Sequence, residues 1–600
     1  MFDRLHQLRR WAGVDRAVFF SSAAQVVRLI TGPITMALVL RYLTPEIQGY
    51  FYAFAGVAAM QVFLEMGFSQ NIFQFASHEY ARLHFTGQRT LEGDPVALSR
   101  LSSLARLSFR YYAVAALIFL AAIGVGGHIF FAISSTRFST GSFKNPAALA
   151  LRLQRQSDPA AQFVCQNLTA PTRAVLTNYL AGQSAEKKFK AALSRDLNVL
   201  LAQTSLYPAL NAAHVQFRPE TEQLREQNPR GRGLAHLNRL VLEDAFPEIM
   251  RSDVAWQGAW WLIAITAALS LAINPAWSLL EGCNQIAILS QFRFWASLGV
   301  FGAVAVALVA GAGIYASGIG AAFNLLVSAI YLGSRWRPFL RQCLEHPRHG
   351  RVSWSREIWP FQWRIATSWM SNYFIFEIIN PVAFFFCGPV EAGRLGMSVQ
   401  LVYMIARIAL TWTNTKAPRL SMLIATRAWR QFDALLRHST IQVVSIYLLG
   451  YFSFLAALLI LSHTALAAHV PLLGHVLSKV PGRLAPFSVN VWLGASQITA
   501  LLVSSMCLEL RAHKRDPLVW MSVLNAVLSI ALMVPFARLW GISGEVVGYT
   551  LALWAVFLPS YKIYQLKRRE YRSQANDLAE PPSSAVKVNR SGTELSGLEP

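Results

Sequence analysis

The sequence predicts an all-α polytopic membrane protein, and its composition is the first reason. Of its 600 residues, 54% are hydrophobic and only 14% are charged, against about 25% charged in soluble domains. The second reason is a series of twelve apolar stretches long enough to cross a bilayer core, which takes about 20 helical residues. A soluble chain of this length would form several domains and could not cover their surfaces with so few charges. An ordinary soluble enzyme is therefore excluded.

We interpret the twelve apolar stretches as transmembrane helices. They run over residues 17–40, 48–76, 109–133, 255–280, 292–316, 318–334, 359–386, 393–413, 440–462, 486–508, 517–537 and 543–565. The first stretch is longer than the apolar core of a signal peptide, which has about 7–15 residues, and it contains Arg28. It therefore reads as a retained first span.

The distribution of Lys and Arg predicts the orientation in the membrane. Twelve spans place both chain ends on one side, and the short segments on that side hold most of the basic residues. The short loops on the other side contain only Arg41, Arg394, Lys479, Arg483 and Arg538. Because Lys/Arg-rich short loops stay in the cytoplasm, we expect both ends of the chain to be cytoplasmic.

Residues 134–254, between the third and fourth spans, are too long for a simple connection. Long segments translocate largely regardless of charge, and the alternation of spans places this insert outside the cytoplasm. Its start, 138–162, is polar and reads as irregular, whereas 172–206 and LNRLVLEDAF (237–246) have helical spacing of apolar residues. The insert shows no His/Cys cluster, Gly-rich loop or catalytic triad pattern. We interpret it as an accessory insertion, with a partner-docking module as the alternative.

The predicted organisation has two six-helix lobes around a central cavity. Its segments are 1–133 and 255–334 for the first lobe, 134–254 for the insert, 335–358 for a basic cytoplasmic inter-lobe loop, 359–565 for the second lobe, and 566–600 for a basic and then disordered cytoplasmic tail. A weak internal repeat supports the two halves. Gly32-Pro33 and the turn 45–49 lead into the second span, as Asn380-Pro381 and the turn 389–393 lead into the eighth. Such repeats are common in transporters, with the substrate site between them.

Five ionisable residues inside the spans are the candidate substrate-binding residues: Arg28, Glu65, Arg364, Glu377 and Arg407. Charges within a membrane are costly and indicate function. Arginine stays charged and its guanidinium binds phosphate oxygens in a bidentate manner, so three arginines against two glutamates favour an anionic ligand. Glu65 has the alternative role of pairing with an arginine and holding helices together.

Two further acidic residues, Glu281 and Glu545, fall nearer the ends of their spans. We expect them to be interfacial rather than part of the substrate site. Arg293, at the start of the fifth stretch, is counted among the basic residues of the short cytoplasmic loops.

Motifs for covalent chemistry are missing from the sequence. The five cysteines are isolated, so a disulfide framework or a thiolate metal site is not expected. There is no GxxxxGK[ST] motif for nucleotide phosphates. We therefore expect no catalytic residue, no metal and no cofactor, and we expect that the protein is not an enzyme.

Several segments resemble the Wzx-type polysaccharide or O-antigen flippases of the multidrug/oligosaccharidyl-lipid/polysaccharide (MOP) export superfamily. They are RYLTPEIQGYFYAF (41–54), QVFLEMGFSQNIFQFASHE (61–79), EIWPFQWRIATSWMSNYF (357–374), NPVAFFFCGPVEAGRLGMS (380–398) and TKAPRL (415–420). The resemblance covers roughly 1–133 and 255–570, and the 134–254 insert departs from it. It implies two lobes around a cavity that faces each side in turn. It also implies a bacterial inner-membrane protein that flips a polyprenyl-pyrophosphate-linked oligosaccharide for lipopolysaccharide O-antigen or exopolysaccharide synthesis.

Two alternatives to a flippase remain open from the sequence. One is a cation-coupled exporter of drugs or metabolites with the same fold, and the other is a non-transporting scaffold whose insert recruits other proteins. The expected partners are the lipid-linked oligosaccharide, membrane lipids, and a polysaccharide polymerase or other assembly proteins. The net charge of +23 lies mainly on the cytoplasmic side, where it attracts anionic lipid, and we expect no nucleic-acid partner.

Overall fold

The computed structural model describes the chain except for a set of short segments and the two ends. The described residues are 16–135, 143, 146–155, 157–202, 206–217, 221–222, 225, 234–246, 254–345, 350, 352–414, 416–463, 480–512 and 517–577. The predicted disordered tail beyond residue 577 and most of the loop between the ninth and tenth spans lie outside them. The described chain is helical apart from one short two-stranded hairpin.

The N-terminal half of the bundle is built from helices on both sides of the insert. Before the insert come α2 (Arg16–Tyr42), α3 (Pro45–Ala58), η1 (Ala59–Gln61), α4 (Val62–Glu65), α5 (Phe68–Tyr80), β1 (Leu83–Phe85), β2 (Leu91–Gly93), α6 (Pro95–Ile118), η2 (Phe119–Gly124) and α7 (Val125–Ser135). After it come α15 (Trp256–Gly282), α16 (Ile286–Val309), η3 (Gly313–Tyr315), α17 (Ala316–Arg335) and α18 (Arg337–Leu344).

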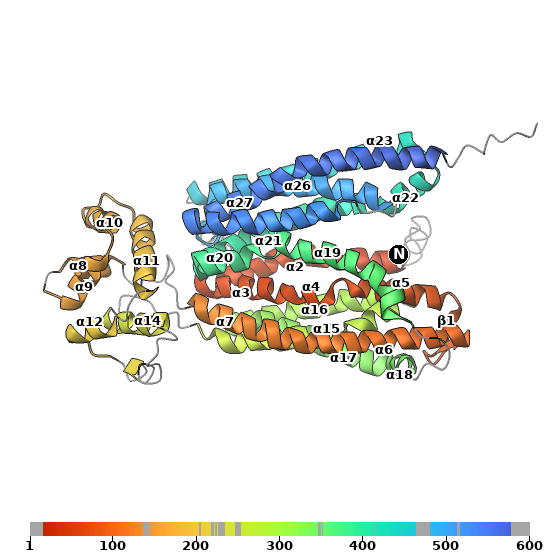
Figure 1. The fold of residues 1–600 in the computed structure, drawn as a ribbon, viewed down its shortest axis with the longest axis horizontal. Coiled ribbons are helices and arrows are strands. Elements are labelled where there is room, and N and C mark those ends of the chain that lie inside the picture. The colour runs from red at the N-terminus through yellow and green to blue at the C-terminus, as the bar shows by residue number, and fades with distance from the viewer. Residues whose placement is uncertain are drawn as a thin grey trace, which may run out of the picture.

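The C-terminal half completes the bundle. Its elements are η4 (Trp354–Ile358), α19 (Trp359–Phe376), α20 (Ile379–Cys387), α21 (Pro389–Asn414), α22 (Ala417–Ala425), α23 (Trp429–His463), α25 (Val480–Arg483), α26 (Phe487–Ala512) and α27 (Val519–Asp577). Figure 1 shows α23, α26 and α27 on one side of the bundle and α6, α15 and α17 on the other. Helices α3 and α19–α21 lie between these two layers.

The described helices confirm an all-α polytopic membrane protein. Nine of them are long and apolar enough to cross a membrane, and there are ten if α19 and α20, bent by 41°, form one span. The stretch 393–413 lies in α21, which is not among these ten, and the last two stretches both lie in α27. The number twelve and the division into two lobes therefore stay predictions.

Helix α27 contains two antiparallel segments rather than one long rod. Gly541 has φ 64° and ψ −148°, which is outside helical geometry. Beyond this turn, a Cβ atom at Gly544 would lie 2.2 Å from the carbonyl oxygen of Phe536, and one at Gly548 would lie 2.8 Å from that of Leu532. The chain thus reverses at Gly541, and the two segments touch along their backbones.

The third membrane helix begins earlier than the apolar pattern indicates. Asp94 accepts a hydrogen bond from the backbone N–H of Val96 and caps α6, whose first residue is Pro95. An N-cap aspartate followed by proline is a strong helix start. The expected loop 77–110 is therefore mostly structured, as the end of α5, the β1–β2 hairpin and the first turns of α6.

The insert has its own helices and its own hydrophobic core. They are α8 (Pro146–Gln154), α9 (Pro159–Asn167), α10 (Ala170–Leu180), α11 (Glu186–Ala202), α12 (Tyr207–Ala212) and α14 (Leu234–Ala245). The helices expected in its middle and at its end are confirmed. The irregular start is wrong, because Asp158 caps α9 and Leu149 and Leu153 of α8 are buried in the insert core. Figure 1 places the insert at one end of the bundle, opposite the described ends of α2 and α27.

Helices α3 and α21 meet in a backbone contact that joins the two halves of the bundle. We call it the α3–α21 seam: Gln48, Gly49, Pro389 and Gly393. The Gln48 side chain is 1% exposed, and its Nε2 donates to the carbonyl oxygen of Gly393 at 2.7 Å. A Cβ atom at Gly49 would lie 1.8 Å from the carbonyl oxygen of Pro389. Only glycine fits at this crossing.

Further contacts join the two halves at the end of the bundle away from the insert. The Asn71 side chain in α5 donates to Gln362 of α19 at 2.7 Å, and Gln362 donates to the carbonyl oxygen of Met66 at 2.7 Å. Arg100 of α6 pairs with Glu79 at 2.7 Å and with Glu357 of η4 at 2.6 Å. The two halves are thus held at both ends of the bundle in this structure.

Replacing Gly49 with alanine should destabilise the protein, although alanine is the better helix former by about 1 kcal/mol. The added methyl group would overlap Pro389, and overpacking of this kind costs about 1–3 kcal/mol. We expect a lower Tm in detergent for Gly49→Ala. The matched control is Gly302→Ala in α16, where a Cβ atom would meet nothing within 4 Å. Equal Tm changes in the two variants would contradict the close contact.

Candidate functional site

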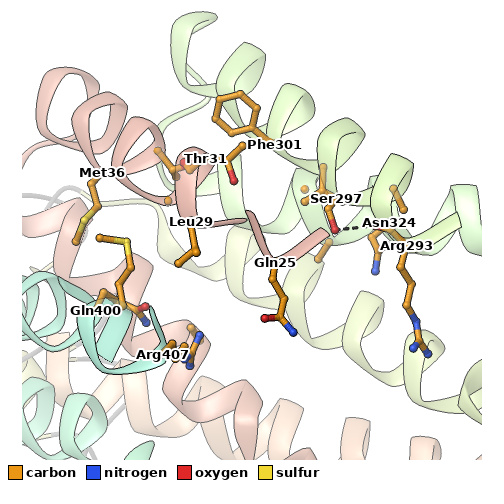
Figure 2. Close-up of a pocket in the computed structure, with 18 of the residues that line it drawn as sticks. Gln25, Leu29, Thr31, Met36, Arg293, Ser297, Phe301, Asn324, Gln400 and Arg407 are labelled. Carbon is orange, nitrogen blue, oxygen red and sulfur yellow. Dashed lines mark hydrogen bonds between the residues drawn. The ribbon is translucent and has the colours of Figure 1, made fainter. Parts of the chain in front are cut away.

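A cavity of about 1170 Å³ lies between six helices, and Figure 2 shows it. Helices α2, α16, α17 and α21 supply most of its walls, with α3 and α15 completing them. This volume exceeds the range of about 300–1,000 Å³ that is usual for pockets of drug-sized ligands. The cavity can therefore hold a large head group.

Two arginines supply the charge of this cavity. Arg293 of α16 and Arg407 of α21 line it, and its lining includes no carboxylate among the described residues. Arg293 forms an ion pair with Glu281 at the end of α15. Arg407 is exposed and makes no ion pair with another described residue. Figure 2 shows Gln25 between the two arginines.

One face of α21 explains how Arg407 reaches the cavity. Gln400, Met404, Arg407 and Thr411 are spaced at i, i+4, i+7 and i+11, which places them on one face of a helix, and all four line the cavity. Ala409 on another face is buried. The α3–α21 seam lies near the start of the same helix, so it helps to fix the position of this face relative to the cavity.

Uncharged polar groups and apolar side chains line the rest of the cavity. The polar ones are Gln25, Thr31, Thr35, Ser297, Asn324, Ser328, Gln400 and Thr411. Apolar residues such as Leu29, Met36 and Phe301 lie between them. A wall of this mixed kind suits a ligand that has both polar and apolar parts.

The structure places one of the five predicted site residues, Arg407, in the lining of the cavity. Glu377 directly follows α19 and does not line the cavity, and although it is close enough to be influenced by the charge of Arg407, the two form no ion pair within 4 Å. Arg28 lies in α2 between Gln25 and Leu29, which both line the cavity, but its side chain is outside the described part.

The other two predicted residues lie elsewhere. Arg364 of α19 is exposed and has the ring of Trp363 5.5 Å from its guanidinium carbon. It lines neither the arginine-lined cavity nor a smaller cavity in the C-terminal half of the bundle. The Glu65 carboxylate accepts a hydrogen bond from Asn274 of α15 at 2.9 Å. Glu65 thus ties two helices together through an amide, where the sequence suggested an arginine.

Arg293 was placed in a short cytoplasmic loop by the sequence analysis, and this placement is wrong. Helix α16 begins at Ile286, so Arg293 lies two turns inside it and faces the cavity. The apolar stretch starts only at 292, because Ser290, Gln291 and Arg293 interrupt the apolar residues at the start of α16. Glu281, twelve residues earlier in the sequence, is the ion-pair partner of Arg293. Its proximity in the sequence could have indicated that Arg293 belongs to the folded bundle.

Glu545 is also not where the sequence placed it. It was expected at an interface, but it is fully buried. It lies just after the Gly541 turn and faces α20 at Ala383. The reversal at Gly541 brings this residue against α20 in the interior of the bundle.

Cysteine labelling tests which face of α21 lines the cavity. In a background with the five native cysteines replaced by alanine, Gln400→Cys and Thr411→Cys should react with a polar thiol reagent about tenfold faster than Ala409→Cys, because reactivity follows exposure of the thiolate. The measurement is the rate of modification by mass spectrometry on detergent-purified protein. Equal rates at the three positions would show that the assigned face is wrong.

Comparisons with known proteins find likeness in solved structures alone. No protein-family model matches the sequence, and neither does any curated protein. A MATE protein in the straight conformation is 12% identical with a TM-score of 0.30, over 90% of this chain and 99% of that chain. A MATE protein in complex with MaL6 is 11% identical with a TM-score of 0.30, over 90% and 99%. An outward-facing multidrug resistance MATE family transporter of the MOP superfamily is 12% identical with a TM-score of 0.28, over 89% and 99%. Likeness at this level assigns neither a family nor a substrate to this chain.

Proposed function

We propose that the protein is a flippase that moves a polyprenyl-pyrophosphate-linked oligosaccharide across the bacterial inner membrane for surface polysaccharide synthesis. The observation that carries the proposal is the 1170 Å³ cavity of a membrane protein whose charged lining residues are arginines. A pyrophosphate needs positive charge, and guanidinium groups bind its oxygens through paired hydrogen bonds. The resemblance of five sequence segments to Wzx-type flippases supports the same substrate class.

Arg407 is the residue that we propose to receive the pyrophosphate. It faces the cavity without a competing ion pair, whereas Arg293 is already paired with Glu281. Arg28 is a second candidate because its neighbours in α2 line the same cavity. The apolar side chains between the polar ones would lie against the polyprenyl end of the lipid. No covalent bond is made or broken in this activity.

Alternating access would require the contacts between the halves to open in turn. The α3–α21 seam would open at the insert end, and the Asn71–Gln362 and Arg100–Glu357 contacts would open at the other. We place the insert outside the cytoplasm and both chain ends inside it, in agreement with the basic residues of the short loops.

Replacing Arg407 with alanine should reduce flipping strongly. Truncating one partner of a desolvated charge pair costs about 2–5 kcal/mol, so we expect a loss of tenfold or more, with partial recovery in Arg407→Lys. The measurement is translocation of a fluorescent polyprenyl-pyrophosphate-linked sugar in proteoliposomes, together with surface polysaccharide in a complemented deletion strain. Arg364→Ala, at an exposed position away from the cavity, is the matched control. Normal flipping by Arg407→Ala would refute the assigned site.

A cation-coupled exporter of drugs or metabolites is the second candidate. The observation in its favour is Glu377, a carboxylate within electrostatic reach of Arg407 that could take part in ion coupling. Drug-resistance profiling of a deletion strain separates the two functions. Sensitivity to cationic drugs without accumulation of lipid-linked sugars would favour the exporter, and the reverse would favour the flippase.

Removal of the insert tests the scaffold alternative. The insert core contains only residues of the insert, and Trp260 of α15 donates directly to the carbonyl oxygen of Gly124 at 2.8 Å. The bundle should therefore stay folded without residues 140–250, and we expect export close to the level of the intact chain. The measurement is surface polysaccharide alongside gel-filtration behaviour. Lost export from a monodisperse deletion variant would instead indicate a required docking role.

A further inference from the structure

A second cavity, of about 380 Å³, lies in the C-terminal half of the bundle. Helices α19, α21 and α26 and both segments of α27 form its walls. Its volume falls within the range of about 300–1,000 Å³ of ligand pockets. Of the six helices that line the arginine-lined cavity, α21 is the one that also lines this second cavity.

The lining of this second cavity is polar and uncharged. Eight hydroxyl or amide side chains face it: Ser368, Asn372, Thr413, Ser504, Ser505, Ser522, Asn525 and Ser560. No charged side chain is among its lining residues in the described chain. Apolar residues such as Phe376, Met521 and Phe557 complete the walls.

Two of these polar side chains are buried and have no partner in the described chain. The Thr413 hydroxyl and the Asn525 carbonyl oxygen make no hydrogen bond, and the two residues are 3% and 7% exposed. Burying such a group without a hydrogen bond is costly, and nearly all buried polar groups in proteins are paired. Thr413 of α21 and Asn525 of α27 both line the cavity, so a polar ligand bound there could supply the hydrogen bonds that these two groups lack.

The serines of α26 leave acceptors free for the same ligand. Ser504 and Ser505 donate to the carbonyl oxygens of Ala500 and Leu501 within their own helix, at 2.8 and 3.1 Å. Because a hydroxyl has one donor and two lone pairs, these two groups can still accept hydrogen bonds from the cavity. The wall thus offers both donors and acceptors without a net charge.

We propose that this second cavity binds a neutral sugar ring. An anion would find no cation in the lining and an organic cation would find no carboxylate, whereas a sugar presents hydroxyl groups that both donate and accept. Apolar residues in the walls suit the C–H faces of such a ring. That the sugar belongs to a lipid-linked head group rests on the function proposed above.

The position of the cavity fits a ligand with an anionic end and a sugar end. Leu410 of α21 lines both cavities. Thr411 faces the arginine-lined cavity, and Thr413, two residues further on, faces the neutral one. A head group with its pyrophosphate at Arg407 would therefore have to pass Leu410, where the two cavities adjoin, to place its sugar in the second one.

Saturation-transfer difference NMR tests the proposal on the full chain in detergent. The probes are the methyl glycosides of glucose, galactose and N-acetylglucosamine, with tetraphenylphosphonium as a cationic probe. We expect a signal from at least one glycoside. The variant Thr413→Val/Asn525→Leu should weaken binding of that glycoside about tenfold, because two hydrogen bonds are lost. Thr411→Val is the matched control on the same helix and should keep the signal.

The outcomes separate this site from the proposed flippase activity. An unchanged glycoside signal in Thr413→Val/Asn525→Leu, or no glycoside signal from the unmodified protein, would overturn the sugar site. Sodium binding by calorimetry that disappears in this variant, without a glycoside signal, would overturn it in favour of a cation site. If the double variant is not monodisperse, Ser522→Ala removes one hydroxyl with little change in volume and should weaken the signal. Failure of the Arg407 flipping assay with an intact glycoside signal would reject the flippase and leave the sugar site standing.

Discussion

The backbones of α3 and α21 touch at Gly49 and Gly393, and the position of the candidate site depends on this contact. A Cβ atom on Gly393 would lie 2.8 Å from the backbone nitrogen of Gly49, so no side chain can separate the helices. Gln48 fastens the contact because its buried amide donates to Gly393 and also accepts from Arg483 at 3.2 Å. Held in this way, α21 presents Arg407 to a cavity of the N-terminal half and Thr413 to a cavity of the C-terminal half. One helix thus connects both binding surfaces that we propose.

Much of the fold could be predicted from apolar stretches alone, because crossing a bilayer imposes a length and a composition that few other segments satisfy. The sequence presents the Pro/Gly turns 45–49 and 389–393 as a related pair, but it cannot show that they touch each other. The site was harder to predict. Arg407 was found because a charge within a span is rare, whereas Arg293 was missed because polar residues after the first turn of α16 hide where that helix begins. Neither cavity follows from periodicity, since each depends on which faces of distant helices come together.

The basic residues of the chain serve the fold as well as the orientation. Arg568 and Arg572 belong to the basic segment at the end of α27, yet both pair with Asp433 of α23 and with the buried Glu509 of α26. Arg100 similarly joins α5 and η4. Counting basic residues in loops predicts which side of the membrane those loops occupy. It overstates how many basic residues can bind anionic lipid, because some are paired with carboxylates of the fold. Glu65 is a site candidate in the sequence, but in the structure its carboxylate accepts a hydrogen bond from Asn274, next to Pro275 in α15. This contact gives Glu65 a structural role.

The reversal of α27 at Gly541 bears on how the chain enters the bilayer during synthesis. The two segments are joined by a single turn, and Gly544 and Gly548 let their backbones touch. The connection is thus too short for the first segment to insert well before the second. An ionisable side chain is costly within a membrane, and the second segment brings in Glu545, which is buried in the bundle. The contact that covers this carboxylate is with α20, at Ala383. The α20 surface against which Glu545 packs is made earlier in translation, so the order of synthesis already provides the place where the hairpin docks.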